Sequence, residues 1–233
     1  MQLPYFFEEN LPFSGDFILS EESSKHIAQV LRMHEGEELL VTNGSGEVIN
    51  ASIILVDKKK TKVNANNRTT SARLSPKVSI AISLIKNTSR FEWFLEKATE
   101  IGVSEIIPLI CARTEKHFIK RDRMKNILVS AMLQSRQCWM PELKEPVKIY
   151  DLMTGHYHQQ KFIAHCFDGE KQQLNHLNVI SGSSIILIGP EGDFTEAEIN
   201  KAIENKYIPV SLGQTRLRTE TAAIVAAVLL MNK

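Results

Sequence analysis

Apolar and polar positions along the chain follow two patterns, which change near residue 70. In the first part, short apolar runs are separated by turn-forming residues, a pattern typical of a small β-rich unit. The elements predicted there are a helix over 21–33 with Ser20 as its N-cap, strands over 38–42 and 48–56, and a polar linker over 64–76.

After residue 76 the pattern predicts strands that alternate with amphipathic helices. The predicted strands are 78–85, 105–110, 161–167, 184–188 and 208–212, and the predicted helices are 89–101, 120–139, 195–205 and 219–231. A run such as Ile185–Ile188 is apolar at every position, which indicates a strand buried on both faces. The sequence therefore predicts an α/β fold with a parallel sheet covered by helices.

Composition limits the class of protein. A length of 233 residues suits one or two domains. No apolar run is long enough for a membrane span, and the first residues lack the pattern of a signal peptide. Three widely spaced cysteines favour a reducing cytoplasm over a disulfide framework. The net charge is only +1, but a basic run at 58–62 is the kind of patch that contacts phosphates.

Two loops near the C-terminus carry the most specific chemistry. The first, Gly189-Pro190-Glu191-Gly192, follows a buried strand and precedes a helix that Thr195 and Glu198 cap reciprocally. Glycine at the end of a strand lets a ligand approach the backbone closely. Taken alone, this segment is equally compatible with a well-made strand-to-helix turn.

The second loop follows the strand that ends at Leu212-Gly213 and places Arg216 and Arg218 before an alanine-rich helix. Arginine at a helix N-terminus is disfavoured by the helix dipole, so Arg218 is expected to have an anionic partner such as Glu220 or Glu191. Two such loops at the carboxyl ends of parallel strands predict a ligand pocket built largely from backbone.

Other nucleotide and hydrolase sites are not supported. The chain has no P-loop, no Gly-x-Gly-x-x-Gly after a first strand and no Gly-x-Ser-x-Gly elbow. His156, His158 and His165 have no familiar zinc spacing, so no metal is expected, although a metal hydrolase remains an alternative.

Several segments in order resemble the RsmE family, the knotted SPOUT methyltransferases that modify N3 of uridine in 16S rRNA. The resemblance covers nearly the whole chain. It rests on His26–Met33, on Lys97–Val103 with the strand after it, on Gln134-Ser135-Arg136, and on the two loops above, Ile188–Gly192 and Leu212–Ala222. One departure is Asp193-Phe194, where the family commonly has glycine and an apolar residue.

The resemblance implies a PUA-like RNA-binding β-barrel over 1–70 and a trefoil-knotted parallel-sheet methyltransferase domain over 71–233. It also implies S-adenosylmethionine as cofactor, a homodimer in the cytoplasm, and a target uridine near the decoding centre of the small ribosomal subunit. The residues implied to bind the cofactor are His165, Leu187, Ile188, Gly189, Pro190, Glu191, Gly192, Leu212, Gly213, Leu217, Arg218, Thr219, Thr221 and Ala222.

Methyl transfer to N3 of uridine requires loss of the N3 proton, and a cation beside O2 or O4 would stabilise the resulting charge. Arg136 is the first candidate for that cation and Arg218 the second, while Glu191 or Glu220 is expected either to accept the proton or to orient an arginine. The residues expected to contact RNA phosphates are Lys25, His26, Arg32, Lys58, Lys59, Lys60 and Arg68.

Two further alternatives remain at this point. A SPOUT methyltransferase acting on another rRNA or tRNA nucleotide would keep the fold and the cofactor and change only the product. An RNA-binding or ribosome-assembly protein without enzymatic activity would not bind S-adenosylmethionine.

Overall fold

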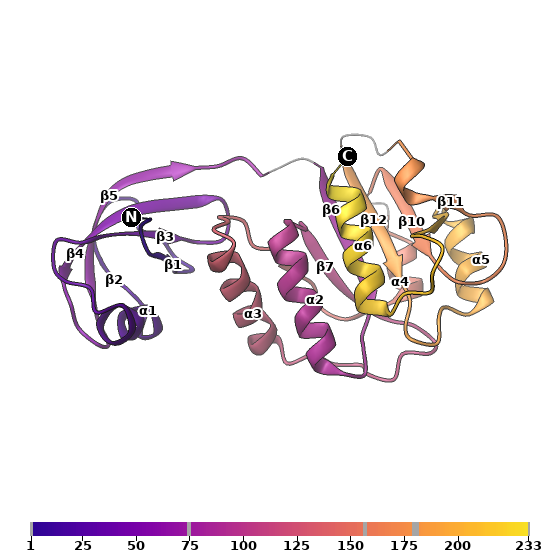
Figure 1. Ribbon diagram of the computed structural model, residues 1–233, viewed down its shortest axis with the longest axis horizontal. Coiled ribbons are helices and arrows are strands. Elements are labelled where there is room, and N and C mark those ends of the chain that lie inside the picture. Colours follow the sequence, from indigo (N-terminus) through magenta and orange to yellow (C-terminus); the bar gives the residue numbers. More distant parts are fainter. Residues whose placement is uncertain (1, 74–75, 156–157, 179–181, 233) are drawn as a thin grey trace. The chain divides into compact units, whose positions relative to one another are not determined.

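The computed structural model describes residues 2–73, 76–155, 158–178 and 182–232. They form two compact units (Figure 1). The first consists of the residues up to Arg73 together with Met132–Met140, and the second contains the remaining residues. None of the helices in the described part of the chain has the length and apolar character needed to cross a membrane.

The N-terminal unit contains a mixed five-stranded sheet in the order β1-β3-β4-β5-β2. Its elements are β1 (Tyr5–Phe7), β2 (Gly15–Ile18), α1 (Glu21–Lys25), the π-helical turn η1 (His26–Leu31), β3 (Glu38–Thr42), β4 (Glu47–Leu55) and β5 (Lys62–Thr70). Strand β1 pairs in parallel with β3, and the other pairs are antiparallel. The core of the unit includes Leu39, Val41 and Ile49 from the sheet and Ile27 from η1.

The structure confirms the helix start at Ser20, whose side chain accepts from the Ser23 N–H. It contradicts the single helix predicted over 21–33, because α1 passes into η1 at His26 and the turn ends at Arg32, with φ +53°. The linker predicted over 64–76 is also wrong, since β5 extends to Thr70. Its polar side chains form cross-strand hydrogen bonds, for example from Asn66 to the Ser52 hydroxyl, so the strand needs few apolar residues.

The second unit contains a parallel sheet in the order β11-β13-β10-β12-β6-β7-β8, with β9 also paired to β7. Its strands are β6 (Lys77–Ser83), β7 (Glu105–Ile110), β8 (Glu142–Leu143), β9 (Val147–Lys148), β10 (Gln160–Ala164), β11 (Gln172–Gln173), β12 (Ser183–Ile188) and β13 (Ile208–Ser211). Its helices are α2 (Thr88–Ile101), α3 (Arg121–Gln134), α4 (Ile149–Met153), the 3-10 turn η2 (Leu174–His176), α5 (Glu196–Glu204) and α6 (Thr219–Met231).

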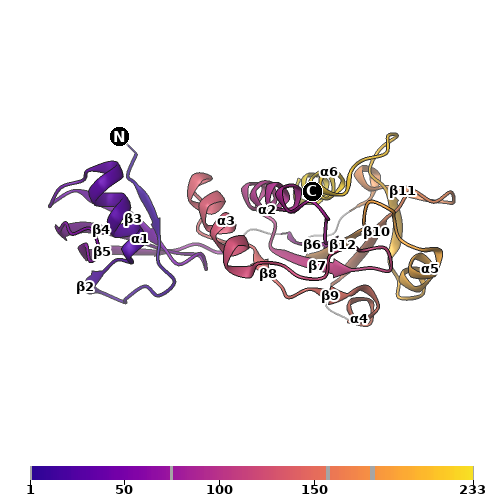
Figure 2. The same cartoon turned by 90° about the horizontal axis from the view of Figure 1, so that it is seen from below.

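Helices cover both faces of this sheet, as the apolar strands predict. Helices α2 and α6 pack together on one face, and α4 and α5 pack on the other (Figure 2). Leu187 and Ile185 of β12 belong to the core shared with α4 and α5. The α/β class and the parallel sheet are therefore confirmed.

Two helix boundaries differ from the prediction. Helix α2 begins at Thr88 rather than at residue 89, and Asn87 caps it, since its side chain accepts from the Ser89 N–H. Helix α3 ends at Gln134 rather than Trp139, since Arg136 has φ +57° and the Gln137 N–H donates to the Met132 carbonyl. These hydrogen bonds close the helix in a left-handed C-cap, which needs no glycine here.

Two of the three thiols, Cys111 and Cys166, should differ sharply in reactivity. Burial raises the pKa of the Cys111 thiol to about 12, and the nearby Glu198 carboxylate adds to the effect. Cys166, in contrast, is exposed. The thiolate is the reactive form, so we expect a short iodoacetamide pulse at pH 8 to modify Cys166 and to leave Cys111 unmodified. Peptide mass spectrometry checks this, with guanidinium-unfolded protein as the control in which both react.

Candidate functional site

A cavity of about 740 Å³ lies at the carboxyl ends of three neighbouring parallel strands. It begins at Ala164 of β10, Ile188 of β12 and Val210 of β13, and the loops that follow these strands complete its walls. Ligands of open parallel sheets bind at this edge, where loops diverge to opposite sides of the sheet. Both C-terminal loops singled out in the sequence thus meet at one cavity.

The loop after β12 is held in a single conformation by its own side chains. Gly189 packs against the ring of Phe194, and a Cβ on this glycine would lie only 3.1 Å from that ring. Asp193 has φ +64°, and its carboxylate accepts from the backbone N–H of Cys166 at 2.7 Å and from that of Phe194 at 2.8 Å. Asp193 therefore ties the loop after β12 to the loop after β10.

The predicted capping box at the start of α5 is present, and its Glu198 also accepts a hydrogen bond from outside the helix. The Glu198 side chain is fully buried, and its Oε2 accepts from the Thr195 N–H at 2.7 Å. Its Oε1 accepts from the Ala112 N–H at 2.7 Å, which links α5 to the segment after β7. One carboxylate thus anchors two loops beneath the cavity.

The loop after β13 is joined to the first loop through Thr219. The Thr219 hydroxyl, 5% exposed, donates to the Gly189 carbonyl at 3.0 Å. Gly213 has φ +152° in the same loop, and a Cβ there would meet no atom within 4 Å. Glycine is thus needed at 213 for its backbone angle rather than for space.

We expect Thr219→Val to lower the free energy of unfolding by about 1–3 kcal/mol, because the buried Gly189 carbonyl loses its donor. Urea denaturation followed by circular dichroism measures the change. Thr221→Val is the matched control, since the Thr221 hydroxyl makes no hydrogen bond to any described residue. Equal stabilities of the two variants would contradict a structural role for the hydrogen bond.

His165 is an unusual polar group on the cavity wall. Both of its ring nitrogens are buried and neither has a hydrogen-bond partner among the described residues. Burial lowers the pKa of His165, Lys171 lowers it further, and Asp193 opposes the change. The ring is therefore neutral at pH 7 and can donate one hydrogen bond and accept another.

Most residues predicted to bind the cofactor line this cavity. They are His165, Ile188, Gly189, Pro190, Glu191, Leu212, Gly213, Leu217, Arg218, Thr219 and Ala222. Three others do not line it: Leu187 is buried in the core, Gly192 accepts from Arg113, and Thr221 lines a second cavity. Their contact with a cofactor stays a prediction.

The candidate catalytic residues occupy different places. Glu191 and Arg218 are exposed and line the cavity, whereas Arg136 belongs to the N-terminal unit and donates to the Leu3 carbonyl. The expected partner of Arg218 is not found within the described residues, and Glu220 instead pairs with Arg90. Glu220 therefore pairs with an arginine of α2 and not with Arg218 as expected.

The residues predicted to contact RNA all lie in the N-terminal unit. Lys25, His26, Arg32, Lys58, Lys59 and Lys60 are exposed. Arg68 is half-buried, where it pairs with Glu47 and donates to the Pro12 carbonyl. Its charge is therefore already partly neutralised by the protein.

Several residues of the cavity were missed by the sequence analysis. Lys171 and the segment 214–216 line it, and Asp193 shapes it. An aspartate directly after a glycine in a turn is a signal for the left-handed conformation that Asp193 adopts. Lys171, whose Nζ donates to the Phe167 carbonyl at 2.6 Å, has no comparable signal.

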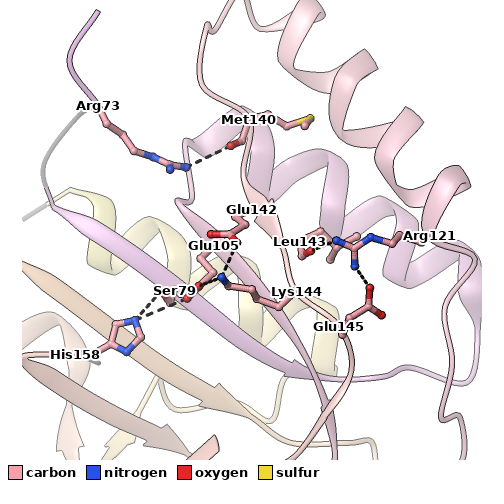
Figure 3. A network of polar contacts seen from close by, with 10 residues as sticks. All are labelled: Arg73, Ser79, Glu105, Arg121, Met140, Glu142, Leu143, Lys144, Glu145 and His158. Carbon is pink, nitrogen blue, oxygen red and sulfur yellow. Dashed lines mark hydrogen bonds and ion pairs between the residues drawn. The ribbon is translucent and has the colours of Figure 1, made fainter. Parts of the chain in front are cut away.

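The two described histidines among the three considered for zinc do not share a site. His158 precedes β10 and His165 follows it, so they lie at opposite ends of the strand, and His156 lies outside the described residues. Among the residues that the structure describes, no three or more metal-ligating side chains gather. His158 instead joins a polar network at the amino ends of β6 and β7 (Figure 3), where its Nε2 lies 2.9 Å from the Ser79 hydroxyl.

This network consists of structural hydrogen bonds. The Ser79 hydroxyl donates to Glu105 at 2.7 Å, and Lys144 lies 3.4 Å from the same carboxylate (Figure 3). Burial lowers the pKa of His158, although Glu105 opposes the change. The network lies at the edge of the sheet opposite the cavity.

Known proteins resemble the chain along its whole length. A crystal structure of a probable rRNA-methyltransferase from Porphyromonas gingivalis is 33% identical, with a TM-score of 0.91, over 97% of this chain and 95% of that one. A putative methyltransferase from Legionella pneumophila, solved with bound S-adenosylmethionine, is 31% identical, with a TM-score of 0.89, over 100% and 98% of the chains. The ribosomal RNA small subunit methyltransferase E of Bacillus subtilis is 29% identical over 95% of this chain and 93% of its own.

Two family models match the sequence. Residues 19–64 match the RNA methyltransferase PUA domain, and residues 73–231 match the RNA methyltransferase domain. Because the second match spans well over half of the chain and contains the whole cavity, the protein belongs to this family of RNA methyltransferases, as its resemblance to the RsmE family predicted.

Proposed function

We propose that the protein transfers the methyl group of S-adenosylmethionine to N3 of a uridine in the 16S rRNA of the small ribosomal subunit. The observation that carries the proposal is the cavity between the two C-terminal loops. Similarity to the Bacillus subtilis small subunit methyltransferase supports the choice of RNA. With ribosomal RNA as the proposed substrate, we infer that the enzyme acts in the cytoplasm.

The cavity suits S-adenosylmethionine in size and chemistry. Its volume of about 740 Å³ falls within the range of small-molecule sites. Ile188, Leu212 and Leu217 offer apolar surface to the adenine ring, and the two unpartnered nitrogens of His165 offer hydrogen bonds to a polar group. When bound, the cofactor supplies a methyl group that is already activated for transfer by its positively charged sulfur.

The residues around the cavity then have little bond-making chemistry to perform. Their task is to hold the methyl group in line with the accepting nitrogen and to exclude water. The link between Thr219 and Gly189 and the link between Asp193 and Cys166 fix the walls before any ligand enters. Such preorganisation reduces the entropy lost on binding.

The N-terminal unit is proposed to bind the RNA through its exposed basic residues, such as Lys25 and Lys58–Lys60. We retain Arg136 as the candidate cation beside the uracil oxygens and the homodimer as the active assembly. Light scattering measures the assembly directly, and Arg136→Ala tests the arginine. A base paired in a duplex hides its N3, so the target uridine must be unpaired or flipped.

Nucleoside mass spectrometry tests the proposal. Small subunits from a strain that lacks the corresponding methyltransferase are incubated with the protein and labelled S-adenosylmethionine, and the RNA is then digested. Labelled 3-methyluridine is the expected product. A different labelled nucleoside would reject the substrate, and absence of label together with absence of cofactor binding would reject the enzymatic function.

A further inference from the structure

A second, smaller cavity of about 340 Å³ lies beside the first. Ser89, Arg90 and Trp93 of α2 line one side, and Arg218, Glu220 and Thr221 at the start of α6 line the other. These helices lie next to each other in both views (Figures 1 and 2). Arg218 lines both cavities, so the two adjoin at this residue.

Glu220 is the unusual group in this second cavity. It is only 6% exposed, and its Oε1 lies 3.6 Å from Nε of Arg90. Its Oε2 is buried and has no hydrogen-bond partner among the described residues. Buried carboxylate oxygens are almost always hydrogen bonded, so an unpartnered one beside a cavity indicates a donor that arrives with a ligand.

The other lining groups define the kind of ligand. Trp93 is 43% exposed, and its indole ring offers a flat apolar surface on which a base can stack. Arg90 and Arg218 are two donors that suit carbonyl oxygens. Uracil presents one N–H, at N3, between two carbonyl oxygens, so a carboxylate flanked by guanidinium groups complements this edge of the base.

We propose that the second cavity receives the target uracil and that Glu220 is the group that takes its N3 proton. This inference rests on the proposed function and specifies its acceptor site. The N3–H bond breaks and the proton moves to Oε2 of Glu220. The electron pair left on N3 forms the bond to the methyl carbon, and the electron pair of the carbon–sulfur bond returns to the sulfur of S-adenosylmethionine.

The geometry favours Glu220 over Glu191 for this role. Glu191 is exposed and lines only the first cavity, whereas Glu220 is buried and lines the second. The unpartnered Oε2 of Glu220 can therefore face a base held in that cavity, whereas Glu191 faces the cofactor cavity. Arg218, between the two cavities, is placed to stabilise the charge that develops on a uracil oxygen.

The test compares Glu220→Gln with wild type in the full chain, on small subunits that lack the modification. Loss of a positioned general base should lower kcat about 10²–10⁴-fold, while calorimetry should give a Kd for S-adenosylmethionine within twofold of wild type. The rate of the variant should also rise with pH toward the alkaline range, because N3 of the uracil must now lose its proton without a general base. Small subunits that carry 5-fluorouridine, whose N3 proton is more acidic, should partly rescue it.

Controls separate catalysis from folding. Glu196→Gln makes the same change in the first turn of α5, at an exposed position away from both cavities, and should behave as wild type. Arg90→Gln breaks the ion pair and keeps the carboxylate, so a purely structural role would give both variants the same loss of Tm and no change in pH dependence. If wild type forms 3-methyluridine and Glu220→Gln forms it within threefold of the wild-type rate, the inference is overturned while the proposed function stands. If wild type forms no 3-methyluridine, the proposed function itself fails.

Discussion

Glu198→Ala is expected to lower the free energy of unfolding by about 3 kcal/mol, because it removes one buried acceptor from three donors. The carboxylate is fully buried and accepts from the N–H groups of Thr195 and Ala112 and from the Thr195 hydroxyl. Alanine leaves these part-buried donors without their acceptor and also opens a cavity. The substitution removes the Glu198 half of the capping box and the link to the segment after β7 together, while Thr195 still caps α5.

Guanidinium denaturation followed by circular dichroism measures the change. Glu196→Ala is the matched control, since Glu196 lies in the same helical turn but is exposed. Glu198→Gln should fall between the two, because its amide oxygen replaces one acceptor while its NH₂ group faces another donor. A loss below 1 kcal/mol for Glu198→Ala would show that water replaces the carboxylate without cost.

The parts of the fold that could be predicted are those fixed by local pattern. The apolar strand β12 and the capping box of Thr195 and Glu198 depend on residues close together in the chain. Strand β5 was missed because its stability comes from pairing with β4 and β2 rather than from its own apolar content. The end of α3 was missed because its left-handed cap is formed by an arginine.

In the candidate site, too, local sequence signals could be recognised and contacts between distant residues could not. Gly189 and Gly213 could be identified because strand ends followed by glycine loops leave a sequence signal. The contacts that hold the loops have none, since Glu198 meets Ala112 and Asp193 meets Cys166 across long stretches of chain. The partner of Glu220 could likewise not be predicted, because both Arg90 and Arg218 line the same cavity and only the packing of α2 against α6 selects Arg90.

Gly46→Ala is expected to destabilise the N-terminal unit by about 3–4 kcal/mol. Gly46 has φ +91°, and a Cβ there would lie 2.3 Å from the Trp139 ring and 2.8 Å from the Ser71 carbonyl. The left-handed backbone costs alanine about 1–2 kcal/mol, and displacing a packed aromatic ring adds about 1–3 kcal/mol. The hydrogen bond from the Trp139 indole to the Ser71 carbonyl would be lost with the ring's position.

Gly36→Ala isolates the backbone contribution, because Gly36 has φ +87° and a Cβ there would meet no atom within 4 Å. We expect it to cost only about 1–2 kcal/mol in urea denaturation followed by tryptophan fluorescence. If the N-terminal unit binds the RNA, warming Gly46→Ala should abolish methylation of small subunits while calorimetry still detects binding of S-adenosylmethionine. Parallel loss of both activities would show that the two units do not fold independently, and the RNA-binding role of the first would then need a test by substitution of Lys58–Lys60 at the surface.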